Sequence, residues 1–363
     1  MRSRRILLAF VAVGALACRD APPEPSLSET RSPNAQPDIV QTLREDLARA
    51  RHPSDGGGQA WLDARPGHVG AGDSGMWTFV YEAGPEGIAV GGMVFLQVSP
   101  FWGWSTPQVQ AEDAPGYTVV STEAEGLVLE PETLGQQLLG IRVGGRALAP
   151  GEQIRIVYGA GLQGARADRY AERESRFWIA VDGDGDGVRR LLPDSPVVEV
   201  GPGPPARMVL TVPSVARPGE VLPLTLAVLD AVGNAWPVIE GDLALAATGG
   251  ASLPESVALS PEDRGRVVVE VTAAAEGTVS IEAHGPSTLN GVSNPLVVSP
   301  TLPRVYWGDL HGHSGLSDGT GTPEDYYRYA RDIAALDVAA LTDHDHWGME
   351  TLSESPELWE GIR

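Results

Sequence analysis

The amino-acid sequence predicts a multidomain protein that is mainly β, with two β-sandwich-like domains followed by the beginning of an α/β unit. Three observations support this prediction. Short runs of alternating apolar and polar or small residues recur about every ten residues between positions 61 and 300. Gly and Pro, 44 and 30 residues of the 363, separate these runs as turn residues do. After position 300 the period changes, and a strand-like run, a helix-like run and a second strand-like run follow one another.

The first 18 residues are organised like an export signal. Basic residues at positions 2, 4 and 5 precede an apolar run from Ile6 to Ala17, which is too short to span a bilayer. Cys18, the single cysteine of the chain, directly follows Ala-Leu-Ala, and this pattern resembles the lipobox of bacterial lipoproteins. We therefore expect an exported protein, periplasmic or at the cell surface, that is lipid-anchored through Cys18. Ordinary signal cleavage near the same position is the alternative.

Residues 19 to 60 are expected to form a linker that contains one short helix. The first part is rich in Pro and Ser and lacks apolar residues to bury, which is typical of a flexible tether. Further along, Ile39, Leu43 and Leu47 recur at helical spacing behind Asp38, a possible cap, so the helix is predicted over 38–51.

The formal net charge of −22 limits the partners of the protein. Nucleic-acid backbones and anionic membrane surfaces carry the same sign of charge and would be repelled. We expect no nucleic-acid partner and no membrane contact except through the lipid anchor. Cations and small phosphorylated or polymeric substrates remain open, and a solvated acidic exterior explains the charge without any partner.

Residues 61–204 are predicted to form one β-sandwich and residues 205–300 a second, immunoglobulin-like one. The stretch "GPGPPA" at 201–206 marks the boundary between them as a linker. The second block has the length of one immunoglobulin-like domain. Its stretch "RPGEVLPLTLAVLDAVGN" resembles the bacterial immunoglobulin-like modules of surface proteins. A spacer or adhesion module is the expected role.

An acidic motif, "VDGDGDGVRRLLPD", lies near the end of the first block. Asp182, Asp184 and Asp186 occupy every second position, as in the opening of a calcium loop. The position of the last EF-hand ligand holds Pro193, so Asp194 would have to substitute in a loop that is not an EF-hand. A structural Ca²⁺ site is one interpretation, and an acidic β-turn without metal is the other.

Residues 301–363 are expected to begin an α/β domain. The run "RVYWGDL" predicts a strand, "TPEDYYRYARDIAALD" a helix with Thr322 as cap and Pro323 at its first position, and "VAALTDH" a second strand. A strand, a helix and a strand in this order form a βαβ unit with parallel strands. Polar residues that follow the two strands should therefore meet at the carboxyl edge of the sheet, where α/β proteins build their sites.

Histidines and aspartates gather at this predicted edge. Nitrogen and carboxylate donors without sulfur suit Zn, Mn or Fe rather than a structural thiolate site. Surface histidines without a metal are the alternative interpretation. The candidate ligands are His311, His313, Asp318 and His344, and the residues that could orient them by hydrogen bonds are Asp309 and Asp343.

The spellings "DLHGHSGLSDG" and "LTDHD" resemble the first two motifs of the polymerase and histidinol phosphatase (PHP) superfamily, and "YWGDLHGHS" is most similar to the family called domain of unknown function 3604 (DUF3604). The resemblance covers Val305 to Trp347. It implies metal ligation by the four candidate residues, a distorted (β/α)7 barrel with a trinuclear site, and phosphoesterase activity. The later motifs of the superfamily have no counterpart in this sequence, so we expect only the incomplete N-terminal part of such a barrel, without a complete site or turnover.

Two functions follow from the sequence. The first is an exported, membrane-anchored, metal-dependent hydrolase of the phosphoesterase type, present as an incomplete chain and inactive alone. The alternative is a non-enzymatic surface binding or adhesion lipoprotein built from β-sandwich domains. No catalytic residue is assignable beyond the metal ligands.

Overall fold

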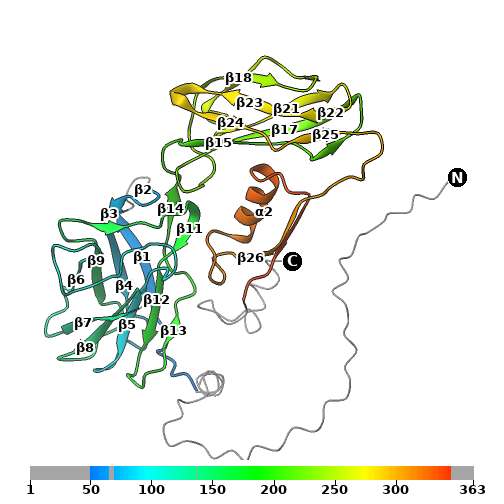
Figure 1. The fold of residues 1–363 in the computed structure, drawn as a ribbon. Helices are drawn as coiled ribbons and strands as arrows, with labels where there is room; N and C mark the ends of the chain where they lie inside the picture. Colours follow the sequence, from blue (N-terminus) through cyan, green and yellow to red (C-terminus); the bar gives the residue numbers. More distant parts are fainter. Residues whose placement is uncertain (1–49, 65–68, 136, 345–363) are drawn as a thin grey trace, which may run out of the picture. The chain divides into compact units, whose positions relative to one another are not determined.

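The computed structural model describes residues 50–64, 69–135 and 137–344 (Figure 1). The signal sequence, Cys18 and residues 38–49 of the predicted linker helix lie outside these residues. The described chain is mainly β, with strands arranged in several sheets, which confirms this part of the predicted fold class. Within the same residues, no helix combines the length and the apolar character needed to cross a membrane.

Two larger sheets form the first group of strands. Their orders are β1-β4-β9-β6 and β13-β12-β5-β8-β7, and all pairings inside them are antiparallel. The first sheet comprises β1 (Gln59–Ala64), β4 (Trp77–Glu82), β9 (Gln153–Tyr158) and β6 (Thr118–Ser121). The second comprises β13 (Arg190–Leu191), β12 (Trp178–Asp182), β5 (Met93–Gln97), β8 (Leu138–Gly144) and β7 (Val128–Gly135). Shorter ladders join β10 (Ala165–Arg166) to β3 (Ser74–Gly75), and β11 (Glu172–Arg176) to β14 (Val197–Gly201) and β2 (Val69–Gly70).

Both large sheets contribute to one hydrophobic core, so this group is a β-sandwich. Strand β9 shows the alternation that produces it, because Ile154 and Ile156 are buried while Arg155 between them is exposed. An aromatic cluster fills the centre, where the rings of Trp77 and Trp104 meet edge to face at 5.1 Å. We call residues 50–204 the first sandwich.

The second group of strands also surrounds one core and forms residues 205–300, the second sandwich. Its two four-stranded sheets have the orders β15-β17-β21-β19 and β20-β18-β23-β24, and a third sheet has the order β16-β25-β22. The strands are β15 (Arg207–Thr211), β16 (Val215–Ala216), β17 (Glu220–Leu229), β18 (Gly241–Ala247), β19 (Ala251–Ser252), β20 (Ser256–Leu259), β21 (Arg266–Ala273), β22 (Gly277–Val279), β23 (Ile281–His284), β24 (Asn290–Val292) and β25 (Leu296–Val298). Two 3-10 turns, η1 (Pro261–Asp263) and η2 (Pro286–Thr288), complete it.

The Asp-x-x-Gly-Asn stretch after β17 is a structural turn. The Asp230 carboxylate accepts backbone hydrogen bonds from Val232, Gly233 and Asn234 at 2.8–3.0 Å. Burial raises the pKa of Asp230, but these and further hydrogen bonds outweigh it and leave the pKa below its ordinary value. The motif is therefore explained by turn chemistry.

Residues 301–344 contain one strand, one helix and a second strand. Strand β26 (Gly308–Gly312) pairs in parallel with β27 (Val338–Leu341), and α2 (Pro323–Asp332) connects them. The helix prediction is confirmed at its start, because Thr322 caps it through Asp325 and Pro323 is its first residue. The predicted helix was too long at its C-terminal end, because α2 stops at Asp332 and Ala335 adopts a left-handed φ of 51°.

Strand β26 begins four residues later than "RVYWGDL" predicts. Side chains of the preceding residues bind the second sandwich: the Trp307 indole donates to the Ser214 hydroxyl at 2.7 Å, and Arg304 donates to the Val215 carbonyl and to Glu220. The Trp307 backbone carbonyl still accepts from Asp337 and Val338 at the start of β27. His311 consequently lies inside β26, and only His313 follows it.

Helix α2 buries its apolar side against the second sandwich. Ile333, at the helix end, is 3% exposed and belongs to a small core cluster with Ala227, Leu229 and Ala235. The Tyr329 hydroxyl donates to the Gly233 carbonyl at 3.1 Å. The helix is therefore stabilised by the β-domain as well as by its own strands.

We expect Ile333→Ala to loosen α2. Truncating this side chain removes apolar burial worth about 2 kcal/mol, at the lower end for core isoleucines because the cluster is small. Amide hydrogen exchange of Pro323–Asp332 should become about 30-fold faster if local opening carries this loss. Val338→Ala, at a side chain that is about half exposed, is the control and should change little. Equal exchange rates in the two variants would contradict the packing role.

Candidate metal centre

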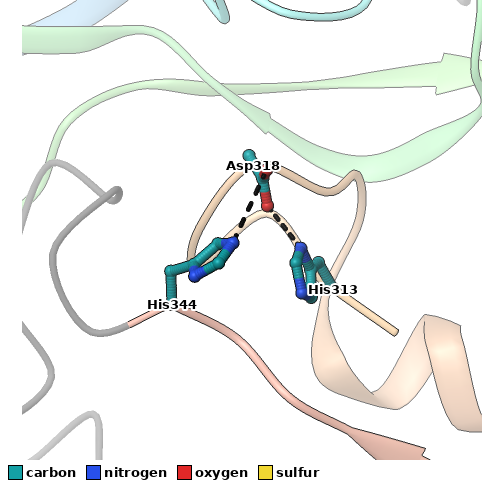
Figure 2. A group of neighbouring side chains, drawn as sticks. All are labelled: His313, Asp318 and His344. Atoms are coloured by element: carbon teal, nitrogen blue, oxygen red, sulfur yellow. Dashed lines mark hydrogen bonds and ion pairs between the residues drawn. The ribbon is translucent and has the colours of Figure 1, made fainter. Parts of the chain in front are cut away.

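Three predicted ligands come together at the ends of β26 and β27. His313 follows β26, His344 follows β27, and Asp318 lies in the loop between β26 and α2. The parallel pairing of the two strands places their carboxyl ends side by side, and the loop folds back over them. Figure 2 shows the two imidazoles directed toward the Asp318 carboxylate, and one donor atom from each of the three residues lies within 4.8 Å of the others.

The Asp318 carboxylate links the two histidines. His313 Nδ1 lies 2.5 Å from one carboxylate oxygen, and His344 Nε2 lies 4.0 Å from the other. The rings of His313 and His344 are close, with centroids 4.5 Å apart. Burial raises the pKa of Asp318, but the hydrogen bond and the charge of His313, with the charge of His344, outweigh it and hold that pKa below its ordinary value.

The buried nitrogen of His313 is the observation that tests whether a metal fits. Nε2 of His313 is one of three buried side-chain polar atoms without a hydrogen-bond partner among the described residues. A buried polar atom without a partner is costly, whereas an imidazole nitrogen is a preferred donor to Zn, Mn or Fe. An imidazole that gives one nitrogen to a metal characteristically bonds a carboxylate through the other, as Nδ1 does here. The donor set therefore fits a divalent metal.

Asp343 forms hydrogen bonds with the loop after β26 rather than with an imidazole. Its carboxylate accepts hydrogen bonds from the Ser314 backbone and hydroxyl at 2.7 and 2.8 Å and from the Ser317 hydroxyl at 2.6 Å. Both serines are buried. Sequence reasoning missed them, although each stands beside a predicted ligand. Asp343 thus fixes the two ends of the segment between His313 and Asp318.

His311 and Asp309 lie beside the three-residue group. Nδ1 of His311 lies 3.2 Å from the Thr342 hydroxyl, and the Asp309 carboxylate accepts from the backbone N–H of His311. The ladder between β26 and β27 is irregular between Asp309 and Gly312, but the rings of His311 and His313 still lie close together, with centroids 4.8 Å apart. The structure does not bring His311 into the group, and its ligand role stays a prediction.

A cavity of about 280 Å³ adjoins the group. His313 and Asp309 line one side, Tyr326 and Tyr329 of α2 another, and Trp236 of the second sandwich a third. Its size is just below that of typical small-molecule pockets. A ligand approaching His313 from this side would meet aromatic rings and two carboxylates, those of Asp309 and Asp325.

The acidic loop of the first sandwich is only partly assembled as predicted. Asp182 and Asp184 come together with Asp55, which the sequence reading missed although it stands in a similar Asp-Gly turn. Asp186 caps the backbone N–H of Val188 at 2.7 Å, and neither Asp186 nor Asp194 joins the group. Burial raises the pKa of Asp182 above its ordinary value, against hydrogen bonds from Gly185 and Gly187. A structural Ca²⁺ here stays a prediction.

No protein-family model matches the chain, and no curated protein matches it. Among solved structures, the Yersinia pseudotuberculosis adhesin InvE aligns with 10% identity over 67% of this chain and 58% of its own, with a TM-score of 0.22. The D0-D1 domain of intimin aligns with 9% identity over 66% and 97%, with a TM-score of 0.22. A β-glycosidase from Bacteroides vulgatus aligns with 13% identity over 72% and 27%, with a TM-score of 0.27. The chain thus spans about three fifths of the adhesin and about a quarter of the glycosidase.

Proposed function

We propose that this chain is the metal-binding part of an exported, lipid-anchored hydrolase of the PHP superfamily, most similar to DUF3604, that acts on phosphate esters. The observation that carries the proposal is the group His313, Asp318 and His344, in which Nε2 of His313 is buried and has no hydrogen-bond partner among the described residues. The paired motifs "HGHSGLSDG" and "TDH" support the family assignment.

Each residue of the group has a distinct task in this proposal. His313 and His344 hold the ion through imidazole nitrogens. Asp318 binds the ion or orients the two imidazoles, and Asp343 keeps the intervening loop in place. A divalent ion held there would supply a Lewis acid that polarises a phosphoryl oxygen. The full superfamily site needs further ligands, so we propose metal binding for these residues and turnover only where further ligands complete the site.

The test uses the whole chain with and without added Mn²⁺, Zn²⁺ or Fe²⁺. We expect stoichiometric metal binding by calorimetry. Release of phosphate from p-nitrophenyl phosphate should depend on the metal if the site is complete. A chain that binds none of the three ions would refute the proposal, whereas binding without turnover would restrict it to metal holding.

A second candidate function is non-enzymatic binding at the cell surface. Its support is that the two sandwiches supply most of the described residues. Binding of the chain to immobilised glycans or matrix proteins, unchanged when His313 and His344 are both replaced with Ala, would favour it. Loss of metal binding in the same double variant would favour the first function.

A further inference from the structure

The loop that carries Asp318 is held from outside its own α/β segment. It connects β26 to α2 and contains Gly315, Gly319 and Gly321, so it has high conformational freedom before folding. Asp343 binds its beginning, as described above. Three residues of the first sandwich bind its other half and the start of α2: Trp102, Glu172 and Arg173.

Trp102 makes the contact nearest to the ligand. Its indole N–H is shared between the backbone carbonyls of Asp318 and Gly319, at 2.9 and 3.0 Å. The ring is itself fixed, because it packs edge to face on Tyr170 at 5.5 Å and lies beneath the Arg169 guanidinium. A rigid donor therefore holds the backbone of the residue whose carboxylate faces both histidines.

The other two contacts continue along the same segment. Glu172 accepts a hydrogen bond from the Gly321 backbone at 3.1 Å. Arg173 donates to the Asp325 carboxylate at 2.6 Å and lies 3.5 Å from Glu324. Since Asp325 also forms the capping box of α2 with Thr322, Arg173 connects the first sandwich to the helix start. Five residues between 318 and 325 thus contact either Trp102 or the Glu172–Arg173 pair of β11.

We infer that the first sandwich is part of the metal centre, with Trp102 as a positioning residue for Asp318 and Arg173 as a weaker one. The inference rests on the proposed metal binding. A glycine-rich loop held at both ends presents its carboxylate in one place, so the ion does not have to order the loop on binding. Neither residue touches the ion. Trp102 acts through the Asp318 backbone, and Arg173 acts through the Asp325 carboxylate at the start of α2.

The test compares Trp102→Phe with wild type in the full chain. Phe keeps an aromatic ring at this position but loses the indole N–H together with the pyrrole ring, so we expect Zn²⁺ or Mn²⁺ affinity to fall about tenfold, at the low end for partners that orient ligands. The absorption spectrum of the Co²⁺-loaded protein should change as well, which a purely structural role would not cause. Trp61→Phe, at a half-buried tryptophan of β1, is the matched control and should leave both unchanged.

Arg173→Gln keeps the inference testable if Trp102→Phe folds poorly. This side chain is nearly half exposed, so the variant should fold, and we expect about a threefold loss of affinity. Its matched control is Arg155→Gln, which breaks a similar exposed pair with Asp63 in the same sandwich. Wild-type affinity and an unchanged Co²⁺ spectrum in both test variants would overturn the inference and leave the metal site standing. A wild-type chain that binds no metal would overturn the proposed function and the inference together.

Discussion

Replacing His313 with Ala is expected to weaken Zn²⁺ or Mn²⁺ binding by at least about 100-fold, on the order of 3 kcal/mol. The reason is that His313 is the central member of the group. Its Nδ1 contacts Asp318, its buried Nε2 has no hydrogen-bond partner among the described residues, and its ring lies against that of His344. Calorimetric titration of the full chain measures the change.

The matched control is His284→Ala, which removes an exposed histidine on β23 of the second sandwich. It should bind metal as the wild type does. His311→Ala is informative beside it, because the structure keeps His311 outside the group. A loss for His311→Ala as large as that for His313→Ala would show that the ion draws in a fourth ligand. An unchanged affinity for His313→Ala would contradict the site.

Replacing Asp168 with Asn is expected to remove much of the pH dependence of stability between about pH 4 and pH 7. Asp168 is fully buried in the first sandwich, where one carboxylate oxygen accepts from the Tyr170 backbone and the other has no hydrogen-bond partner. Burial is the main cause that raises its pKa to about 7, and the nearby charge of Glu172 adds to it.

The sign follows from proton binding. In the unfolded chain Asp168 releases its proton near pH 4, whereas the folded chain retains it up to about pH 7. The folded state therefore binds more protons in this window, and the free energy of unfolding falls as pH rises through it, by roughly 4 kcal/mol. Burial also raises the pKa of Glu172, which acts in the same direction and remains in the variant.

Urea unfolding of the full chain at pH 4.5 and pH 8 measures this effect. The wild type should lose stability between the two values, and Asp168→Asn should lose clearly less. Asp73→Asn, at an exposed aspartate of the neighbouring turn, removes a charge without burial and should follow the wild type. Equal pH profiles for Asp168→Asn and wild type would show that the carboxyl is hydrated in solution.

Much of the fold was predictable because it depends on local pattern. Alternation of apolar residues predicted strands such as β9, and Thr322 followed by Pro323 predicted the start of α2. The prediction was wrong at the ends of elements that contact another domain. The Trp307 indole bonds to Ser214 of the second sandwich, and the helix ends where Ile333 packs into the same domain. The pattern of apolar and polar residues in 301–344 does not predict those contacts.

By itself, the sequence determined which candidate residues stand near the ends of the two strands: histidines and an aspartate of a βαβ unit, with His313 and Asp318 only five positions apart. The tertiary structure decided which of them meet. Parallel pairing of β26 and β27 brings His344 to Asp318, while His311 borders the group with its ring 4.8 Å from that of His313. It also decided that Asp55 joins the acidic loop, that Asp168 is buried, and that Trp102 holds the Asp318 backbone. These contacts join residues far apart in the chain, so they depend on how whole sheets and loops pack, which local spacing does not specify.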